Sequence, residues 1–321
     1  MAKDEYIFAV ARVKAMENEL LKKQDIDSLI SATNMDALQR ILVDKGLIQN
    51  ETEMNNFVEV QNNKLWSFIS ELTQDKGAFV TIKLKNDFHN AKVAIKSEYM
   101  GQDNENLYEQ DSIIPYKEIE TAVKTKTFSN LPAFIAPYVE KAYEIIFKTN
   151  DPQLSDSILD KGQLFAMNEF AQNNGSDVLI DYAKTQATIA DIKIAVRGAK
   201  TKKDQSFFDN ALSGVSEFNL NQLSNIASQG EDSLYSFLEN SGYTETVDLL
   251  KDDFLRFETW ADNKIMEDIE KQKYVFTTIS PIIAYILARQ NEIKNVNIII
   301  ASKKNGINEE DIRKMVTKSY V

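Results

Sequence analysis

The sequence has no cysteine and one histidine, His89, and both scarcities narrow the chemistry open to it. Without cysteine there is no disulfide framework, no thiolate metal site and no cysteine nucleophile. With one histidine, metal sites that need two imidazoles are excluded, and a Ser-His-Asp arrangement would have to use His89. We therefore expect neither a metal nor another cofactor.

Glycine and proline are also scarce. The chain has ten Gly and five Pro in 321 residues, where average usage would give about 39 of the two together. So few turn-forming residues speak against a many-stranded sandwich or barrel and favour long helices. The glycines match neither G-x-x-x-x-G-K-[ST] nor G-x-G-x-x-G, so no standard phosphate-binding loop is present.

Positive charge is in the minority, with 37 Lys and Arg against 49 Asp and Glu and a net charge of −12. A general nucleic-acid binder would carry the opposite sign. Long hydrophobic runs are missing as well. The apolar stretch 6–11 is too short for a secretory signal, and residues 275–288 fall short of a membrane span. We expect a cytoplasmic chain that does not cross a membrane.

Apolar residues recur at helical spacing along most of the chain. In residues 6–20 they follow one another at steps of four, three, three and four, which lines one face of a helix. Thr33 or Asn34 can cap a second helix, and Gly46 can end it in a left-handed conformation. Residues 79–84 fit both a strand and a helix, and we predict a helix. Polar stretches near residues 105 and 205 are candidate domain boundaries.

Three ten-residue segments, 87–96, 188–197 and 292–301, align without a gap at spacings of 101 and 104 residues. Each has apolar residues at its second, fifth, seventh, eighth and ninth positions, and the fourth position is Asn90, Asp191 or Asn295. We predict three related domains, 1–105, 106–205 and 206–321, in which these three residues hold backbone geometry rather than a ligand. His89 has no histidine counterpart, so we expect a half-buried polar residue there.

A basic run stands out in this acidic chain, because residues 192–203 contain no acid. It either docks an acidic partner or lies in water, and the sequence favours neither. The acidic residues of 245–270 are interpreted as a solvated helix face. The run consists of Lys193, Arg197, Lys200, Lys202 and Lys203.

Several stretches resemble one known family. They are Ser-Pro-Ile-Ile-Ala-Tyr-Ile-Leu-Ala-Arg at 280–289 with Asn-Glu-Ile-Lys-Asn at 291–295, Lys-Asn-Gly-Ile-Asn-Glu-Glu-Asp-Ile-Arg at 304–313, the opening Tyr-Ile-Phe-Ala-Val-Ala-Arg at 6–12, and Asp151-Pro152 with Asp156 and Asp160. Together they resemble the C subunit of the bacterial and archaeal V-type (A/V-type) ATPase, the relative of the d subunit of the eukaryotic V-ATPase. Gln290 departs from the family, where many members carry an acid.

The resemblance implies an all-α protein of three similar helical domains around a pseudo-threefold axis, with a funnel-like central cavity. It implies a peripheral protein on the cytoplasmic face of the membrane that joins the central stalk, made of the D and F subunits, to the membrane rotor ring. Such a protein couples ATP hydrolysis or synthesis to proton or sodium transport without catalysing a reaction or binding a cofactor. The motif residues expected to be structural are Arg12, Asp87, Asn90, Asp191, Glu292 and Asn295.

Two other classes of function stay open on the residues alone. One is an acidic helical-repeat adaptor unrelated to membranes, and the other is an enzyme with an unrecognised carboxylate site. Binding to a D–F stalk pair would separate the rotor protein from the adaptor. An enzyme should show a cleft with several coupled ionisable groups.

Overall fold

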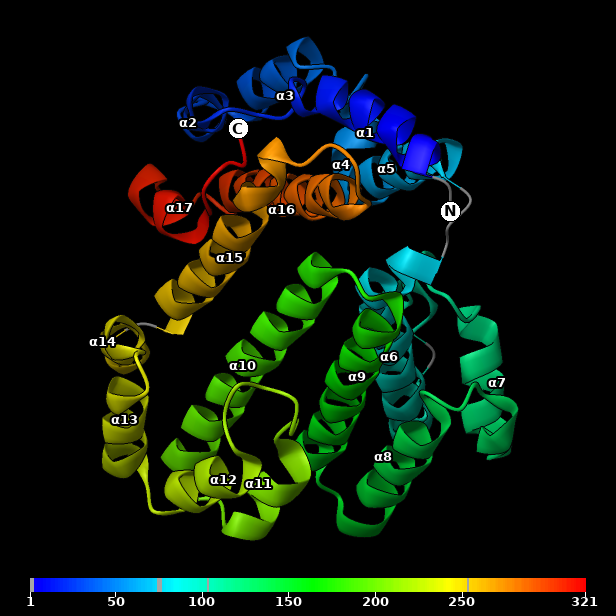
Figure 1. Cartoon of the computed structure of the whole chain (residues 1–321), viewed down its shortest axis with the longest axis vertical. Helices are drawn as coiled ribbons and strands as arrows, with labels where there is room; N and C mark the ends of the chain where they lie inside the picture. The colour runs from blue at the N-terminus through cyan, green and yellow to red at the C-terminus, as the bar shows by residue number, and fades with distance from the viewer. Residues whose placement is uncertain (1–2, 74–76, 103, 253) are drawn as a thin grey trace. The chain divides into compact units, whose positions relative to one another are not determined.

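All regular secondary structure is helical in the part of the chain that a computed structural model describes, residues 3–73, 77–102, 104–252 and 254–321 (Figure 1). No strand occurs within these ranges. This confirms the all-α fold that the family resemblance implies and agrees with the long helices that the scarcity of glycine and proline favours. The chain divides into two compact units: unit 1 is Met1–Asp75 with Asp248–Val321, and unit 2 is Lys76–Val247.

Unit 1 is built around one long helix, α16 (Ser280–Lys304), which is buried over most of its length. Aliphatic residues of α16 share one hydrophobic cluster with residues of the first 57 positions, so segments from both ends of the sequence form a common core. The elements that pack around α16 or on one another in unit 1 are α1 (Lys3–Glu17), α2 (Lys23–Ile30), α3 (Met35–Asp44), α4 (Glu51–Asn55), α5 (Phe57–Leu72), α15 (Phe254–Glu270), η3 (Lys271–Tyr274) and α17 (Glu309–Met315).

Unit 2 is centred on α9 (Pro152–Asn174), which packs against α6 (Gly77–Met100), α8 (Ala136–Thr149), α10 (Asp177–Lys200) and α11 (Gln205–Ala211). Shorter elements cover these helices. They are η1 (Glu105–Leu107), α7 (Tyr116–Thr125), η2 (Phe128–Asn130), α12 (Leu220–Ser228) and α13 (Glu231–Asn240), and α14 (Thr244–Asp252) follows them in the chain.

Two glycines allow close helix packing in unit 2. A Cβ atom on Gly162 of α9 would lie 2.7 Å from Tyr138 Cδ1 of α8, and one on Gly198 of α10 would lie 2.7 Å from Phe208 Cζ of α11. Real Cβ atoms essentially never come within 3.0 Å of such neighbours. Both helices therefore approach their partners at positions where only a hydrogen atom fits.

Local signals in the sequence mostly match the elements. The Asn34 side chain caps α3 by accepting a hydrogen bond from the Ala37 N–H at 2.8 Å, and Gly46 after α3 has a φ of +70°. Residues 79–84 lie within α6, which confirms the predicted helix. The predicted helix over 6–20 is too long, because α1 ends at Glu17 and a turn carries buried Leu20 into α2.

The division into domains 1–105, 106–205 and 206–321 stays a prediction. Its boundary near 105 would separate α6 from α9, which are in contact within unit 2.

Candidate functional site

The three aligned segments lie on the three longest helices of the described ranges, α6, α10 and α16, of 24, 24 and 25 residues. Their fourth-position side chains, Asn90, Asp191 and Asn295, are all buried. A polar side chain buried in the core is expected to have a hydrogen-bond partner, because burying an unpaired polar group costs free energy. Each of the three has a backbone partner.

Asn90 and Asn295 bind the backbone in the same two-bond arrangement. Asn90 Oδ1 accepts from the Glu109 N–H at 2.8 Å, and its Nδ2 donates to the Glu109 carbonyl at 2.9 Å. Asn295 Oδ1 accepts from the Thr317 N–H at 3.0 Å, and its Nδ2 donates to the Thr317 carbonyl at 3.1 Å. Each amide thus fixes one residue of the segment that follows its helix.

Asp191 binds the returning chain in the corresponding way in the middle segment. Its Oδ1 accepts from the Ser213 N–H at 2.7 Å and its Oδ2 from the Ser213 hydroxyl at 2.8 Å. The partners lie 19, 22 and 22 residues after Asn90, Asp191 and Asn295. The three helices therefore use one position in one way, to tie down the returning chain.

The first positions of the aligned segments also hold backbone. Asp87 Oδ1 accepts from the Ile114 N–H at 2.7 Å, and Thr188 Oγ1 accepts from the Glu217 N–H at 3.2 Å. Glu292 accepts from the Leu21 N–H and pairs with Arg289. The third segment thus binds the backbone just before α2.

Burial raises the pKa of each acidic motif residue. Loss of hydration raises the pKa of Asp87 to about 6, although hydrogen bonds from the backbone of residues 113 and 114 act in the opposite direction. Burial likewise raises the pKa of Asp191 and of Glu292, opposed by hydrogen bonds from Ser213 in the first case and by the Arg289 charge in the second. These acids belong to the core and are separated along three different helices.

The polar residues around Glu292 were not predicted from the sequence. Arg289 Nη2 donates to Gln61 Oε1 at 2.8 Å, and Gln61, fully buried, donates through Nε2 to the Leu47 carbonyl. Gln61 lies on the apolar face of α5, among buried apolar residues. That placement was the one sequence signal that pointed to a buried polar contact here. The network ties α5 and the residues around Leu47 to α16.

Two other residues noted in the sequence are more exposed. Arg12 lies 3.6 Å from Glu71 in an exposed ion pair and 5.4 Å from the centre of the Phe68 ring. Such a pair contributes about 0 to 1 kcal/mol. His89 is exposed rather than half-buried, and its Nε2 lies 2.9 Å from the Leu107 carbonyl oxygen.

The basic run occupies the end of α10 and the turn after it. Lys193, Arg197 and Lys200 stand at steps of four and three residues, so they share one face of the helix. Arg197, Lys200 and Lys202 are exposed, and Lys193 and Lys203 are partly buried. Lys203 Nζ lies 3.9 Å from Asp151 Oδ2 and 5.0 Å from the centre of the Phe207 ring. The five cations therefore lie on the last turns of α10 and on the three residues that follow it.

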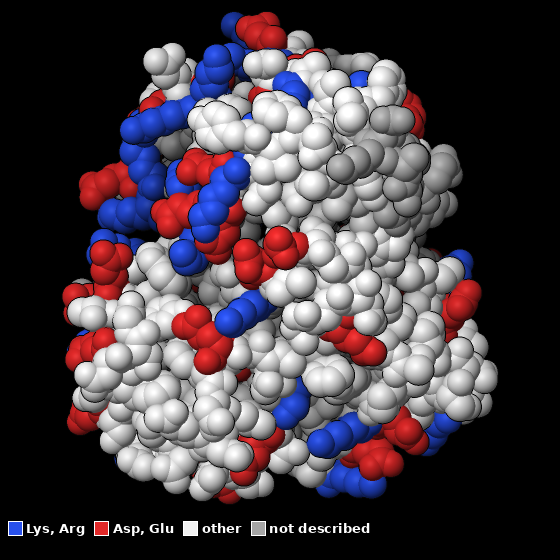
Figure 2. Space-filling model, in the orientation of Figure 1, with Lys and Arg blue, Asp and Glu red and all other residues white. Residues whose placement is uncertain are grey.

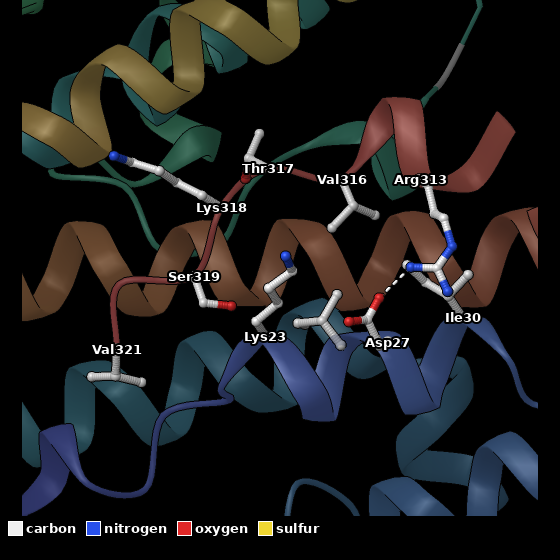
Figure 3. A pocket seen from close by; sticks show the side chains of 10 residues that line it. Lys23, Asp27, Ile30, Arg313, Val316, Thr317, Lys318, Ser319 and Val321 are labelled. Atoms are coloured by element: carbon white, nitrogen blue, oxygen red, sulfur yellow. Dashed lines mark hydrogen bonds and ion pairs between the residues drawn. The ribbon is translucent and has the colours of Figure 1, made fainter. Parts of the chain in front are cut away.

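A groove in unit 1 was not predicted from the sequence. It has a volume of about 370 Å³ and lies between α2, α17 and residues 316–321 (Figure 3). In it Asp27 and Arg313, 286 residues apart, point toward each other and form an ion pair, with Lys23 and Lys318 nearby. Figure 2 shows cationic and acidic side chains interleaved at the upper left, where Figure 1 places α2 and α17. We call this cavity the α2–α17 groove.

Neither a membrane span nor a metal-binding cluster occurs in the described ranges. None of the helices there is both long and apolar enough to cross a membrane. Within the same ranges, no three His, Asp or Glu side chains are grouped so as to hold a metal ion.

The family model of the ATP synthase (C/AC39) subunit matches residues 9–315, nearly the whole sequence. The chain belongs to this family. The match confirms the resemblance based on residues 6–12, 151–160 and 280–313.

Curated relatives of the family are similar over most of their length. The C subunit of the V-type sodium ATPase of Enterococcus hirae is 21% identical over 96% of this chain and 97% of its own. The C subunits of the A-type ATP synthases of Methanobrevibacter smithii and Methanocaldococcus jannaschii are each 21% identical, over 94% and 97% of this chain and 85% and 86% of theirs. This family member therefore matches its relatives over most of their length.

Proposed function

We propose that this chain is a non-catalytic rotor subunit of a V-type or A-type ATPase. It joins the central stalk, made of the D and F subunits, to the membrane rotor ring and transmits torque between them. The observation that carries the proposal is the family match over residues 9–315. One relative is named as part of a sodium ATPase and two as parts of ATP synthases, so the proposal covers proton or sodium transport and either direction of the ATP reaction.

The structure supports a mechanical role in two ways. A torque-transmitting part needs stiff, packed elements, and α6, α10 and α16 are long helices that each tie down a distant segment through buried polar side chains. The second support is that the acids whose pKa values are raised by burial, Asp87, Asp191 and Glu292, serve in these structural attachments. We place the subunit at the cytoplasmic face of the membrane as a peripheral protein.

The proposed three similar domains around a pseudo-threefold axis draw support from the same helices. Each of them carries the aligned segment, with the fourth position buried and bound to backbone 19 to 22 residues later. Superposition of the segments around Asn90, Asp191 and Asn295 in an experimental structure tests this proposal.

We assign the stalk contact to the basic run at the end of α10. The run is free of acids from 192 to 203 in a chain of net charge −12, so it suits an acidic partner. Reversing Arg197, Lys200, Lys202 and Lys203 together should slow association with the D–F pair at low salt. Association unchanged at every ionic strength would make the run a solvated face.

The decisive experiment is reconstitution of the ATPase complex in vesicles with and without this subunit. ATP hydrolysis and ion uptake are recorded side by side. Without the subunit, the catalytic head should still hydrolyse ATP, but ion uptake should stop because torque has no route to the ring. Ion uptake that persists would refute the coupling role and favour an adaptor unrelated to the membrane machine.

A further inference from the structure

We infer that the stalk contact has an apolar centre beside the basic run, formed by Tyr99, Met100 and Phe147 at one end of unit 2. This inference rests on the proposed function and adds to it the residues that anchor the partner. We call the three side chains together with Lys200, Lys202 and Lys203 the aromatic–basic end. Its partner is an acidic segment that presents at least one large apolar side chain.

The apolar part lies where α6 and α8 finish. Tyr99 and Met100 are the last residues of α6, and Phe147 is in the last turn of α8. The rings of Tyr99 and Phe147 meet edge to face, with centres 5.4 Å apart. Tyr99, Phe147 and Met100 are 37%, 42% and 53% exposed. Three large apolar side chains thus reach solvent from two adjacent helix ends.

A hydrogen bond and an ion pair connect this apolar part to the basic run. The Tyr99 hydroxyl donates to Asn150 Oδ1 at 3.0 Å. Asn150 ends α8, and the next residue, Asp151, caps α9 and lies 3.9 Å from Lys203. Figure 1 shows the turn between α8 and α9 at the same end of unit 2 as the end of α10. The two surfaces are therefore neighbours.

The aromatic side chains are held in position before any partner arrives. Phe147 stacks on buried Tyr143 with ring centres 4.3 Å apart, and Tyr99 donates a hydrogen bond to Asn150. Ordered side chains lose little freedom on binding, which leaves more of the interaction energy for affinity. Tyrosine and other large aromatic residues dominate binding energy at the centres of interfaces.

Charge selects the partner. Some charges at this end are already paired, since Asp151 lies 3.9 Å from Lys203, Asp156 lies 2.7 Å from Lys96, and Glu144 lies 2.9 Å from Lys148. The basic run itself carries five cations and no acid over residues 192–203 in a chain of net charge −12, so it suits an acidic partner. An apolar centre inside a charged rim is the usual anatomy of a specific interface.

The test measures binding of the purified D–F stalk pair to the full-length chain. Phe147→Ala and Met100→Ala should each weaken binding about tenfold at both low and high salt, because they remove apolar contact. The matched control is Phe165→Ala, which removes a phenylalanine that is 46% exposed on α9 of the same unit. This control should bind like wild type.

Two outcomes would overturn the proposals, and they are distinguishable. If wild type does not bind the stalk pair, the proposed function itself fails. If wild type binds and the Phe147, Met100 and Phe165 variants all bind equally well, the stalk contact stands and the aromatic–basic end is wrong. Because truncating exposed Met100 leaves the core intact, its result keeps the test valid even if Phe147→Ala impairs folding.

Discussion

Single polar residues inside long helices carry much of the organisation of this molecule. Asn90, Asp191 and Asn295 would each weaken an isolated helix, because short polar side chains compete for backbone hydrogen bonds. Here they bind backbone groups of segments that have left the helix. A residue that looks unfavourable locally is thus explained by what it holds across the core.

Removing one such residue should release the segment it holds. Asn295→Ala leaves the buried Thr317 N–H without its acceptor, which costs about 1 to 3 kcal/mol. We expect lower stability in urea and faster hydrogen exchange at Thr317 and Lys318. Asn297→Ala, at an exposed position of the same helix, is the control. Equal exchange at Thr317 in both variants would show that Asn295 does not hold the segment.

Asp87 should make stability depend on pH. Burial raises its pKa from the ordinary value of 3.8 to about 6, so between these values the folded protein binds more protons than the unfolded chain. Stability contributed by the protonated group is full below pH 3.8 and is lost as pH rises through about 6. One pKa unit corresponds to about 1.4 kcal/mol, which gives a loss of up to about 3 kcal/mol.

Asp87→Asn should remove this dependence. The free energy of unfolding of wild type relative to the variant should fall between about pH 4 and pH 7, as measured by urea unfolding at several pH values. Asp181→Asn, which replaces an exposed aspartate of α10, controls for the change in net charge. Parallel pH curves for wild type and Asp87→Asn would contradict the assignment.

At the scale of elements, two helix contacts in unit 2 are so close that no side chain would fit at the glycine where they meet. Gly198→Ala would drive a Cβ atom against the fully buried ring of Phe208. Overpacking of this kind costs about 1 to 3 kcal/mol. We expect a lower urea midpoint with an unchanged helical signal.

The control for Gly198→Ala is Gly101→Ala. Gly101 has a φ of +63° and nothing within 4 Å of an added Cβ, so that variant bears only the backbone penalty of about 1 kcal/mol. If Gly198→Ala is as stable as wild type, α10 and α11 do not pack at this distance.

The sequence predicted most helices but not the residues that they contact across the core. Helical spacing, Asn34 and Gly46 predict helices and their ends because those signals are local. Nothing local links Asn295 to Thr317, or Asp27 to Arg313, since the partners lie in segments with no repeat of their own. The aligned positions were found because three copies share them, while the exposed pair of Tyr99 and Phe147 occurs once.

At the scale of the whole molecule, unit 1 is discontinuous and unit 2 is inserted within it. A fragment covering 76–247 contains α9 together with α6, α8, α10 and α11, which pack on it, so we expect a helical fragment that unfolds cooperatively. A fragment covering 106–205 lacks α6 and α11 and exposes the faces of α9 that they cover. Circular dichroism and urea unfolding of both fragments distinguish the two divisions. A stable 106–205 fragment would favour three separate domains.

The discontinuity of unit 1 also sets an order of events during synthesis. The cluster that joins residues near Leu29 and Leu42 to Val296 and Ile299 cannot form until α16 has left the ribosome. About 220 residues, 76–295, are made in between, which takes roughly 10 to 45 s at about 5 to 20 residues per second. During that interval the apolar faces of α2 and α3 lack their cover, so the nascent first 75 residues are a natural client for a chaperone that shields hydrophobic surface.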